Sequence, residues 1–223
     1  MHKKVMVGVP CLYGKVDGYF FNSYIETLKL CEKNNIQLQS ILLINESILP
    51  MARNEILNLA YLEKYDSLVF IDDDEKWNPE DFLEIIQSEK DVVGLPVVNK
   101  GDLDIKYNVF LDDQNKIFQD STDGYIKTNK IGTGFLKLSN KVISDLWNSN
   151  TSIEFRGKIL KSICEYEFND NFFIGEDITL CKKIRELGYD IWVKPDSTVE
   201  HIGPKIYKGD FNSFLKNNFE ILK

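Results

Sequence analysis

Residues 67–75, with the sequence SLVFIDDDE, decide how the rest of the chain is organised. Four apolar residues run into a cluster of acidic residues here, and Asn78-Pro79 then opens an amphipathic segment. This order predicts a buried strand, a tight loop and the start of a helix. The three aspartates therefore stand at the carboxyl end of a strand, which is where open α/β sheets bind their ligands.

The local sequence leaves open how the negative charges of Asp72, Asp73 and Asp74 are balanced. Two carboxylates about 4 Å apart repel each other by roughly 4 kcal/mol at an effective dielectric constant near 20. Such a cluster therefore favours a bound divalent cation, a basic partner or a raised pKa. The alternative is a solvated turn that also caps the helix after Asn78.

The composition is that of an acidic globular protein. Its 223 residues include 27 lysines and arginines against 35 aspartates and glutamates, and the net charge of −8 argues against nucleic acid as the main partner. One domain over residues 1–223 is the default expectation at this length. The four cysteines form no metal-ligand pattern, the start is not a secretory signal, and no apolar run approaches the length of about 18 residues that a membrane span needs. We therefore expect a cytoplasmic protein without a transmembrane segment.

The segments around the acidic stretch alternate between strand and helix patterns. Apolar runs predict strands, and segments with an apolar residue every three or four positions predict helices. Strands are predicted at 5–9, 36–44, 67–71 and 91–98, with helices at 18–33, from 49 onward and from 79 to 88. This alternation is typical of an α/β fold with an open, mostly parallel central sheet and helices on both faces.

The second half of the chain is less regular. Polar residues with short alternating runs predict a small hairpin-rich insertion over 99–130, and 150–174 is predicted to be irregular. A buried strand over 131–136 and a helix over 139–147 come between them. Apolar residues at helical spacing predict an amphipathic C-terminal helix over about 210–222. We expect this helix to pack on the core, with peripheral contact to a membrane as the alternative.

Two further groups of polar residues stand at the ends of predicted elements. Glu176 and Asp177 follow Gly175 at the start of a helix, where acidic residues are favourable simply because they oppose the helix dipole. His201 stands near the C-terminus, and a lone histidine is more often structural than a ligand. Because strand and helix ends share one crevice in an open sheet, these residues and the aspartates at 72–74 together indicate a common site.

A set of short motifs runs through the chain in a fixed order. It consists of Ala52-Arg53-Asn54, Phe70-Ile71-Asp72-Asp73-Asp74 with Trp77-x-Pro79, Gly132-Thr133-Gly134-Phe135, Gly175-Glu176-Asp177 with Gly188-Tyr189, Pro195-Asp196, and His201-x-Gly203. In order and spacing this set resembles the glycosyltransferases of the GT-A fold, of the family-2 type, over about residues 5–205. The resemblance implies a Rossmann-like GT-A domain that uses a nucleotide sugar.

The resemblance implies a metal site built from Asp72, Asp74 and His201. The two aspartates match the outer positions of an Asp-x-Asp motif, which in this fold holds a divalent cation against the diphosphate of a nucleotide sugar. The histidine matches a late residue that completes the metal shell in many members. A mixed oxygen and nitrogen ligand set suits Mn²⁺ at least as well as Mg²⁺. The cation would neutralise the charge that builds up on the leaving diphosphate.

The resemblance also implies where the nucleotide lies. Arg53 matches a basic position near the diphosphate, and Asp73 would lie near the ribose. Pro10, Cys11 and Asn45 occupy positions where the first two strands cradle the base. Family members often carry Asp-Asp-Gly-Ser after the second strand, whereas this chain has Asn-Glu-Ser there, so the resemblance does not identify the base.

Two further motifs are implied to take part in the transfer. Asp177 matches the acid that removes a proton from the acceptor hydroxyl in inverting members, with Glu176 as its neighbour. Gly132, Thr133 and Gly134 would let the backbone approach the transferred sugar or the acceptor. The sequence has no Gln-x-x-Arg-Trp motif of the processive synthases. The expected activity is therefore the non-processive transfer of one sugar from a nucleotide-diphosphate sugar to a glycan hydroxyl.

Other classes of protein stay open. A phosphatase of the haloacid-dehalogenase type also places Asp-x-Asp after a buried strand, but on the first core strand and with threonine or valine usual at the position of Glu75. A nucleotidylyltransferase would need a glycine-rich basic loop after the first strand, of which residues 14–18 are a weak version. A nucleotide-sugar or glycan-binding module without transferase activity is the non-enzymatic alternative. The chain would also suit one module of a larger glycan-assembly protein.

Overall fold

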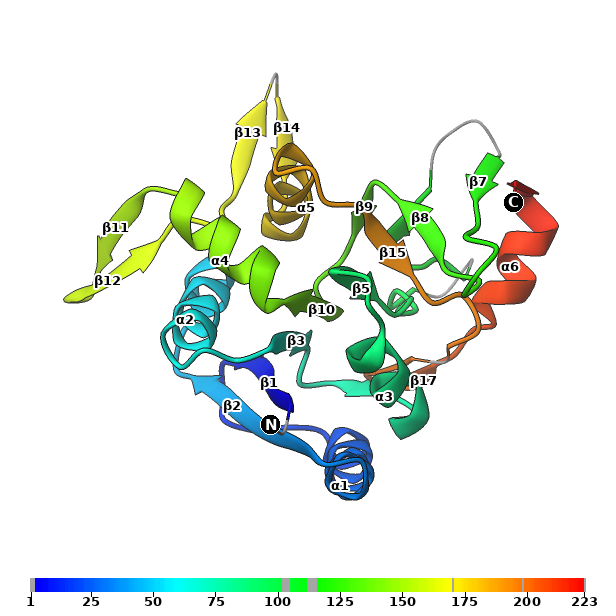
Figure 1. Ribbon diagram of the computed structural model, residues 1–223, viewed down its shortest axis with the longest axis horizontal. Coiled ribbons are helices and arrows are strands. Elements are labelled where there is room, and N and C mark those ends of the chain that lie inside the picture. Colours follow the sequence, from blue (N-terminus) through cyan, green and yellow to red (C-terminus); the bar gives the residue numbers. More distant parts are fainter. Residues whose placement is uncertain (1–2, 102–104, 112–115, 170, 198, 223) are drawn as a thin grey trace.

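The computed structural model describes residues 3–101, 105–111, 116–169, 171–197 and 199–222. Within these ranges the centre of the molecule is a seven-stranded sheet with the order β2-β1-β3-β10-β5-β15-β8 (Figure 1). Its strands are β1 (Lys3–Cys11), β2 (Ile36–Ile44), β3 (Ser67–Ile71), β5 (Val92–Gly94), β8 (Ile126–Thr128), β10 (Phe135–Ser139) and β15 (Ile191–Val193). β1, β2, β3, β5 and β15 run parallel to one another, and β10 and β8 run antiparallel to them.

Helices cover both faces of this sheet (Figure 1). They are α1 (Gly18–Lys33), α2 (Leu49–Leu62), α3 (Pro79–Gln87), α4 (Asn140–Ser149), α5 (Glu176–Glu186) and α6 (Phe211–Asn218). α1 and α3 contribute to the buried cluster on one face, whereas α2, α4, α5 and α6 contribute to the cluster on the other. The predicted fold class is confirmed at this level: the chain has a Rossmann-like α/β fold with a mostly parallel central sheet, helices on both faces and additional small hairpin sheets.

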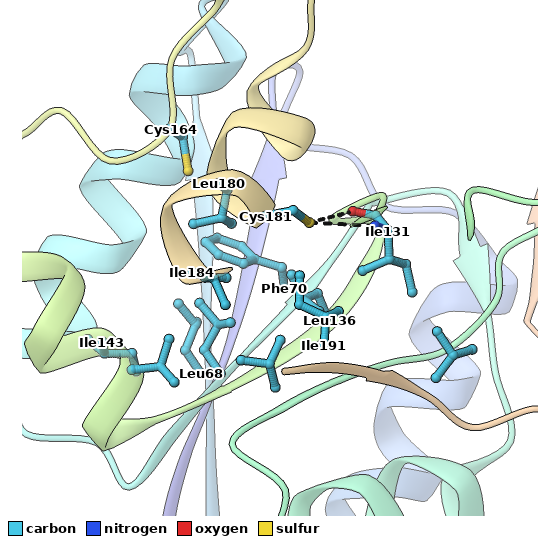
Figure 2. Packing of buried hydrophobic residues seen from close by; sticks show 14 of the residues in the cluster. Leu68, Phe70, Ile131, Leu136, Ile143, Cys164, Leu180, Cys181, Ile184 and Ile191 are labelled. Carbon is cyan, nitrogen blue, oxygen red and sulfur yellow. Dashed lines mark hydrogen bonds between the residues drawn. The ribbon is translucent and has the colours of Figure 1, made fainter. Parts of the chain in front are cut away.

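Strand β3 shows why the sheet is buried on both sides. Leu68 and Phe70 belong to the cluster on the α2 and α5 face, where Figure 2 shows them among the side chains of Leu136, Leu180 and Ile184. The residues between them in the strand, Val69 and Ile71, belong to the cluster on the α1 and α3 face. Successive side chains of a strand point to opposite faces, so a continuous apolar run fits a strand with helices on both sides.

The chain leaves β3 as predicted. Asp72 N donates a hydrogen bond of 3.0 Å to Gly134 O, which holds the acidic turn against the loop before β10. Asn78 then caps α3, since its side chain accepts a hydrogen bond of 3.2 Å from Glu80 N, and Pro79 is the first residue of the helix. The aspartates therefore lie in a short turn between two fixed elements.

A small second sheet brings the C-terminal part of the chain to this turn. β4 (Glu75–Lys76) pairs with β16 (Glu200–Ile202), which pairs in turn with β17 (Ile206–Tyr207). In this register His201 lies opposite Glu75. Ile202 N also donates a hydrogen bond of 2.8 Å to Asp74 O. A histidine that is distant in sequence thus lies beside the acidic turn.

Hairpins are present, but the clearest ones lie outside the predicted insertion. Residues 150–174, predicted to be irregular, form two hairpins, one from β11 (Ser152–Phe155) and β12 (Lys158–Lys161), the other from β13 (Glu167–Asn169) and β14 (Phe172–Ile174). Part of the predicted insertion over 99–130, namely 102–104 and 112–115, lies outside the described residues.

The described part of the insertion pairs mostly with distant strands. β6 (Val109–Phe110) pairs with β9 (Lys130–Ile131), and β7 (Lys116–Phe118) pairs with β18 (Glu220–Leu222). A tight turn follows β7 and is closed by an antiparallel bridge between Gln119 and Ile126. The insertion is tied to the central sheet through β8, which pairs with β15, and to the C-terminal segment through the pair of β7 and β18.

The tail differs from its prediction as a helix over 210–222. α6 ends at Asn218, because Phe219 adopts extended backbone angles (φ −137°, ψ 148°), and the following residues form β18. Phe211 and Leu215 of α6 are buried in the core, so the expectation that the tail packs on the core is confirmed.

Among the described helices, none is long and apolar enough to cross a membrane. The four cysteines are buried and unpaired, as small hydrophobic side chains would be.

Candidate active site

A cavity of about 420 Å³ opens at the carboxyl ends of β1 and β3. These strands are parallel neighbours, so the residues that follow them lie at the same edge of the sheet. The cavity is lined by Pro10, Cys11, Leu12, Tyr13, Glu46, Ser47, Leu49, Asp72, Asp73, Asp74 and His201. The structure thus brings six of the predicted site residues to one cavity.

Asp74 has two partners of basic type. His201 Nε2 lies 3.3 Å from Asp74 Oδ1, and the Lys100 ammonium group forms an ion pair with Asp74 Oδ2. Burial acts to raise the pKa of Asp74, but the hydrogen bonds from His201 and Lys100 outweigh it and hold that pKa below its ordinary value. The other ring nitrogen of His201 lies 2.9 Å from Val98 O, which fixes the orientation of the ring.

Asp72 is paired with a buried guanidinium group. Arg53 Nη2 donates to Asp72 Oδ1 over 3.1 Å, and Arg53 Nη1 binds Glu176 Oε1. Burial disfavours the charge on Arg53, yet the two carboxylates raise its pKa above the ordinary value. Arg53 therefore stays charged and links the turn after β3 to the start of α5.

Asp73 faces the end of β1. Its carboxylate is in hydrogen-bonding contact with the Cys11 thiol, and its backbone oxygen accepts a hydrogen bond of 3.0 Å from Asp17 N. Burial raises the pKa of Asp73, and the negative charges of Asp74 and Asp72 act in the same direction. Cys11 and Asp73 together form one wall of the cavity.

The predicted base-binding residue Asn45 does not line this cavity. Asn45 has a positive φ of 64°, so the chain turns there, and the side chain borders a separate cavity of about 240 Å³ together with Arg156 and Lys158. The next residues, Glu46 and Ser47, line the main cavity instead. The family resemblance placed the loop of Asn45, Glu46 and Ser47 near the base, and the second and third residues of this loop, rather than Asn45, line the cavity.

The loop from Gly132 to Gly134 lies behind the acidic turn. A Cβ atom on Gly134 would overlap Glu75 Oε1 and would lie 3.2 Å from Asp72 Oδ2, so only glycine lets these carboxylates come so close to the backbone. Thr133 is buried, and its hydroxyl oxygen has no hydrogen-bond partner among the described residues. The loop thus touches the acidic turn directly, although it does not line the cavity itself.

The acids at the start of α5 have different environments. Glu176 is buried and bound to Arg53. Asp177 is only partly buried, and its Oδ1 accepts a hydrogen bond of 2.8 Å from Ile178 N in its own helix turn. Glu176 therefore belongs to the ion-pair network around Arg53, whereas Asp177 is the acid that a solvent-borne group can reach.

Two functional candidates have no counterpart in the predicted site. Lys100 follows the predicted strand 91–98, and the rule that parallel strands end at one edge would have placed it beside Asp74. Glu75 is buried in β4, and its Oε2 has no hydrogen-bond partner within the described ranges. Burial, followed by the charges of Asp72 and Asp74, raises the pKa of Glu75 well above its ordinary value. Glu75 is the last of four consecutive acidic residues, and nothing in this local sequence indicates that its side chain is buried.

The residues fit a divalent cation in chemistry, although the predicted triad is not assembled as a unit. In the part of the chain that the structure describes, no group of three or more His, Cys, Asp or Glu side chains is arranged to hold a metal ion. Asp74 and His201 nevertheless form a carboxylate and imidazole pair at 3.3 Å on the cavity wall, which is a donor pair that suits Mn²⁺. Asp72 lies on the same wall but is engaged by Arg53.

Comparison with known proteins supports the fold. No protein-family model and no curated protein matches the chain. Among solved structures, A197 from STIV is similar at a TM-score of 0.56 and 16% identity, over 99% of this chain and 97% of that chain. At this identity the likeness shows a shared fold.

Two other solved structures are similar at lower scores. The fragment 1-349 of TarS from S. aureus matches at a TM-score of 0.49 and 16% identity, over 87% of this chain and 58% of that chain. A glycosyltransferase involved in the glycosylation of the major capsid of PBCV-1 matches at a TM-score of 0.33 and 15% identity, over 65% of each chain.

Proposed function

We propose that this chain is a glycosyltransferase that moves one sugar from a nucleoside-diphosphate sugar to a hydroxyl group of a glycan. The observation that carries the proposal is the cavity at the end of β3, which acidic residues and an imidazole line, and whose aspartates are paired with two cationic side chains. A diphosphate is a strongly anionic leaving group, and a site for it needs local positive charge in a chain whose net charge is −8. Arg53 and Lys100 supply that charge.

The nucleotide end of the donor would occupy the cavity between the ends of β1 and β3. Pro10 and Cys11 form one wall for the base, and Asp73 beside Cys11 offers a carboxylate to the ribose hydroxyls. The diphosphate would then extend toward Asp74 and Lys100. The volume of about 420 Å³ is in the usual range for a site that holds a small ligand.

Mn²⁺ or Mg²⁺ is the cofactor that this donor set suits. Asp74 and His201 would hold the cation, with Asp72 as the further acid on the same wall. When bound, the cation would supply charge neutralisation for the leaving diphosphate. The Lys100 ammonium group forms an ion pair with Asp74. When the cation binds, Lys100 would either share the Asp74 carboxylate with it or turn to the phosphate oxygens of the donor.

Asp177 is the acid that we assign to the acceptor side, in an inverting mechanism. A sugar hydroxyl is a poor nucleophile, and a carboxylate within hydrogen-bond reach can take its proton as the new glycosidic bond forms. Glu176 is held by Arg53, so it orients the start of α5 rather than taking the proton. Gly132, Thr133 and Gly134 lie behind Asp72 and do not line the cavity, so we assign this loop the support of the acidic turn rather than contact with the sugar.

Thermal-shift measurements with UDP-, GDP-, TDP- and ADP-sugars, with and without Mn²⁺, test the proposal. At least one donor should raise the melting temperature, since a ligand that binds only the folded state stabilises it. Asp74→Asn should remove the Mn²⁺-dependent part of the shift. Asp177→Asn should keep the shift and lower transfer by about 10²- to 10⁴-fold. Asp190→Asn is a control, because Asp190 forms an exposed ion pair with Lys127 at the far edge of the sheet, at β15 and β8.

The same binding and transfer measurements distinguish a transferase from a binding module and from a nucleotidylyltransferase. A binding module would show the shift without turnover, and a nucleotidylyltransferase would form a nucleotide sugar from a sugar phosphate and release pyrophosphate. A transferase should hydrolyse its donor slowly when no acceptor is present. The absence of a shift with every donor, or equal loss of binding and transfer in Asp177→Asn, would refute the assignment.

A further inference from the structure

The hairpin of β13 and β14 carries aromatic side chains that face solvent. Phe168 is 81% exposed, Phe173 is 59% exposed and Tyr166, just before β13, is 43% exposed. Figure 1 shows this hairpin projecting from the body of the molecule beside α5. Single exposed apolar residues are ordinary, but several that contact one another mark a binding surface.

These three rings share one face of the hairpin. Phe168 and Phe173 lie directly opposite each other in the strand register, with ring centroids 5.5 Å apart. The Tyr166 ring lies 5.0 Å from that of Phe173. Tyr166 and Phe168 are two residues apart, so they point to the same side. Phe172 is 74% exposed as well, but it precedes Phe173 and therefore faces the other side.

The hairpin leads directly into the start of α5. β14 ends at Ile174, and Gly175 then caps the helix that begins with Glu176 and Asp177. Burial raises the pKa of the Tyr166 phenol, and the charges of Glu176, Arg53 and Asp177 act on it as well. The platform of three rings, Tyr166, Phe168 and Phe173, therefore belongs to the hairpin that leads into the first helix turn of α5, where Asp177 lies.

The aromatic rings and the paired charges around them favour a sugar over an anionic membrane surface as the ligand of the platform. A pyranose ring presents C–H groups on its faces, and these pack on the electron-rich faces of aromatic rings, while its hydroxyls stay in water. An anionic membrane surface would need unpaired cations near the rings. The nearby lysines are instead paired with glutamates, since Lys182 lies 3.0 Å from Glu167 and Lys183 lies 2.6 Å from Glu165.

We propose that Tyr166, Phe168 and Phe173 form the platform on which an uncharged acceptor oligosaccharide lies, with its reacting hydroxyl directed to Asp177. This inference rests on the proposed function, because it names the acceptor of that same site. The sugar units beyond the reacting one stack along the hairpin, so the enzyme extends or decorates a chain rather than a free monosaccharide. The rings contribute to acceptor binding and take no part in donor binding.

Saturation-transfer NMR with maltohexaose, cellohexaose, mannohexaose and chitohexaose measures acceptor binding without the donor. At least one of these oligosaccharides should bind the wild-type protein. The double variant Phe168→Ser/Phe173→Ser should weaken that binding by about tenfold or more, since it removes two of the three rings on which the sugar units stack. Phe172→Ser is the matched control, because it removes an equally exposed ring from the opposite face and should change binding less than twofold.

The outcomes separate this inference from the proposed function. The shift caused by nucleotide sugars and Mn²⁺ should be the same in the double variant and the wild type, because the rings lie outside the donor cavity. If donors bind but no oligosaccharide does, or if Phe172→Ser weakens binding as much as the double variant, the platform is refuted and the transferase assignment stands. If the rings are instead needed for binding to phosphatidylcholine and phosphatidylglycerol vesicles, the platform is a membrane contact. If oligosaccharides bind but no donor does, the proposed function fails while the platform remains.

Discussion

Arg53 Nη2 donates a hydrogen bond of 3.1 Å to Asp72 Oδ1, which ties helix α2 to the acidic end of strand β3. The second terminal nitrogen of the same guanidinium group binds Glu176 at the start of α5. Arg53 is buried, so it balances both carboxylates away from water. The acids on the donor side and the acids assigned to the acceptor side therefore share one cation.

Arg53→Met should lower the free energy of unfolding by about 3–5 kcal/mol, because Glu176 stays buried without a counter-charge. Urea denaturation measures this loss. Adding Glu176→Gln should restore part of the stability, since the uncompensated charge is then gone. Arg53→Lys is the control that keeps the charge but cannot bind two carboxylates in the same way, and it should be intermediate. A double variant no more stable than Arg53→Met would contradict the role given to this ion pair.

Lys100→Met should strengthen the binding of Mn²⁺ alone, because the ammonium group and a divalent cation compete for Asp74. A gain of roughly three- to tenfold corresponds to about 0.7–1.4 kcal/mol, which is the range of a partly exposed ion pair. The same variant should bind a nucleoside diphosphate more weakly, since one cation near the phosphates is lost. Calorimetric titrations measure both affinities. Unchanged affinity for both ligands would show that Lys100 has no part in the site, and Lys116→Met provides an exposed control.

Gly134→Ala should destabilise the protein by about 1–3 kcal/mol, since the new methyl group overlaps the carboxylate of Glu75 and presses on Asp72. The cost should shrink in a Glu75→Ala background, where the overlapping group is absent. A double-mutant cycle in thermal unfolding measures this coupling. Gly101→Ala is the matched control, because a Cβ there meets no atom of the described residues within 4 Å. Equal costs for Gly134→Ala in both backgrounds would exclude the steric explanation.

Much of the central sheet could be predicted because its signals are local. The apolar run of β3 and the cap formed by Asn78 and Pro79 lie within a dozen residues of each other, and the structure has both as predicted. The rule that parallel strands end at one edge then places Asp72 and Asp74 beside the end of β1. The position of His201 near Asp74 came from the family resemblance, and the structure places the two side chains 3.3 Å apart.

The features that the sequence could not predict depend on tertiary partners. β18 pairs with β7, which is about a hundred residues earlier, and a short amphipathic run that pairs at such a distance is also compatible with a helix. The hairpin of β13 and β14 exposes its phenylalanines, so it lacks the alternation of apolar and polar residues that reveals a strand. Asn45 has a positive φ angle and does not line the cavity, and its local sequence gives only a weak preference for that backbone conformation.

Lys137 provides a test of the core that is independent of the active site. It lies in β10 with its side chain buried, and its ammonium group donates hydrogen bonds to Lys90 O at 2.5 Å and Ser88 O at 3.3 Å. Burial lowers the pKa of Lys137 to about 8, the charge of Lys3 acts in the same direction, and Asp91 opposes it. In the unfolded chain the same lysine has its ordinary pKa of about 10.4.

Between pH 8 and about 10.4 the unfolded chain binds the proton of Lys137 more strongly than the folded protein does. The contribution of Lys137 to stability therefore rises with pH across this window. Relative to Lys137→Met, the wild-type protein should gain about 2 kcal/mol in the free energy of unfolding between pH 7 and pH 10. Urea titrations at several pH values measure this difference, with Lys29→Met as the exposed control that should follow the wild type. A constant difference between the wild type and Lys137→Met across the range would mean that Lys137 stays charged in the folded protein, held by its two carbonyl partners.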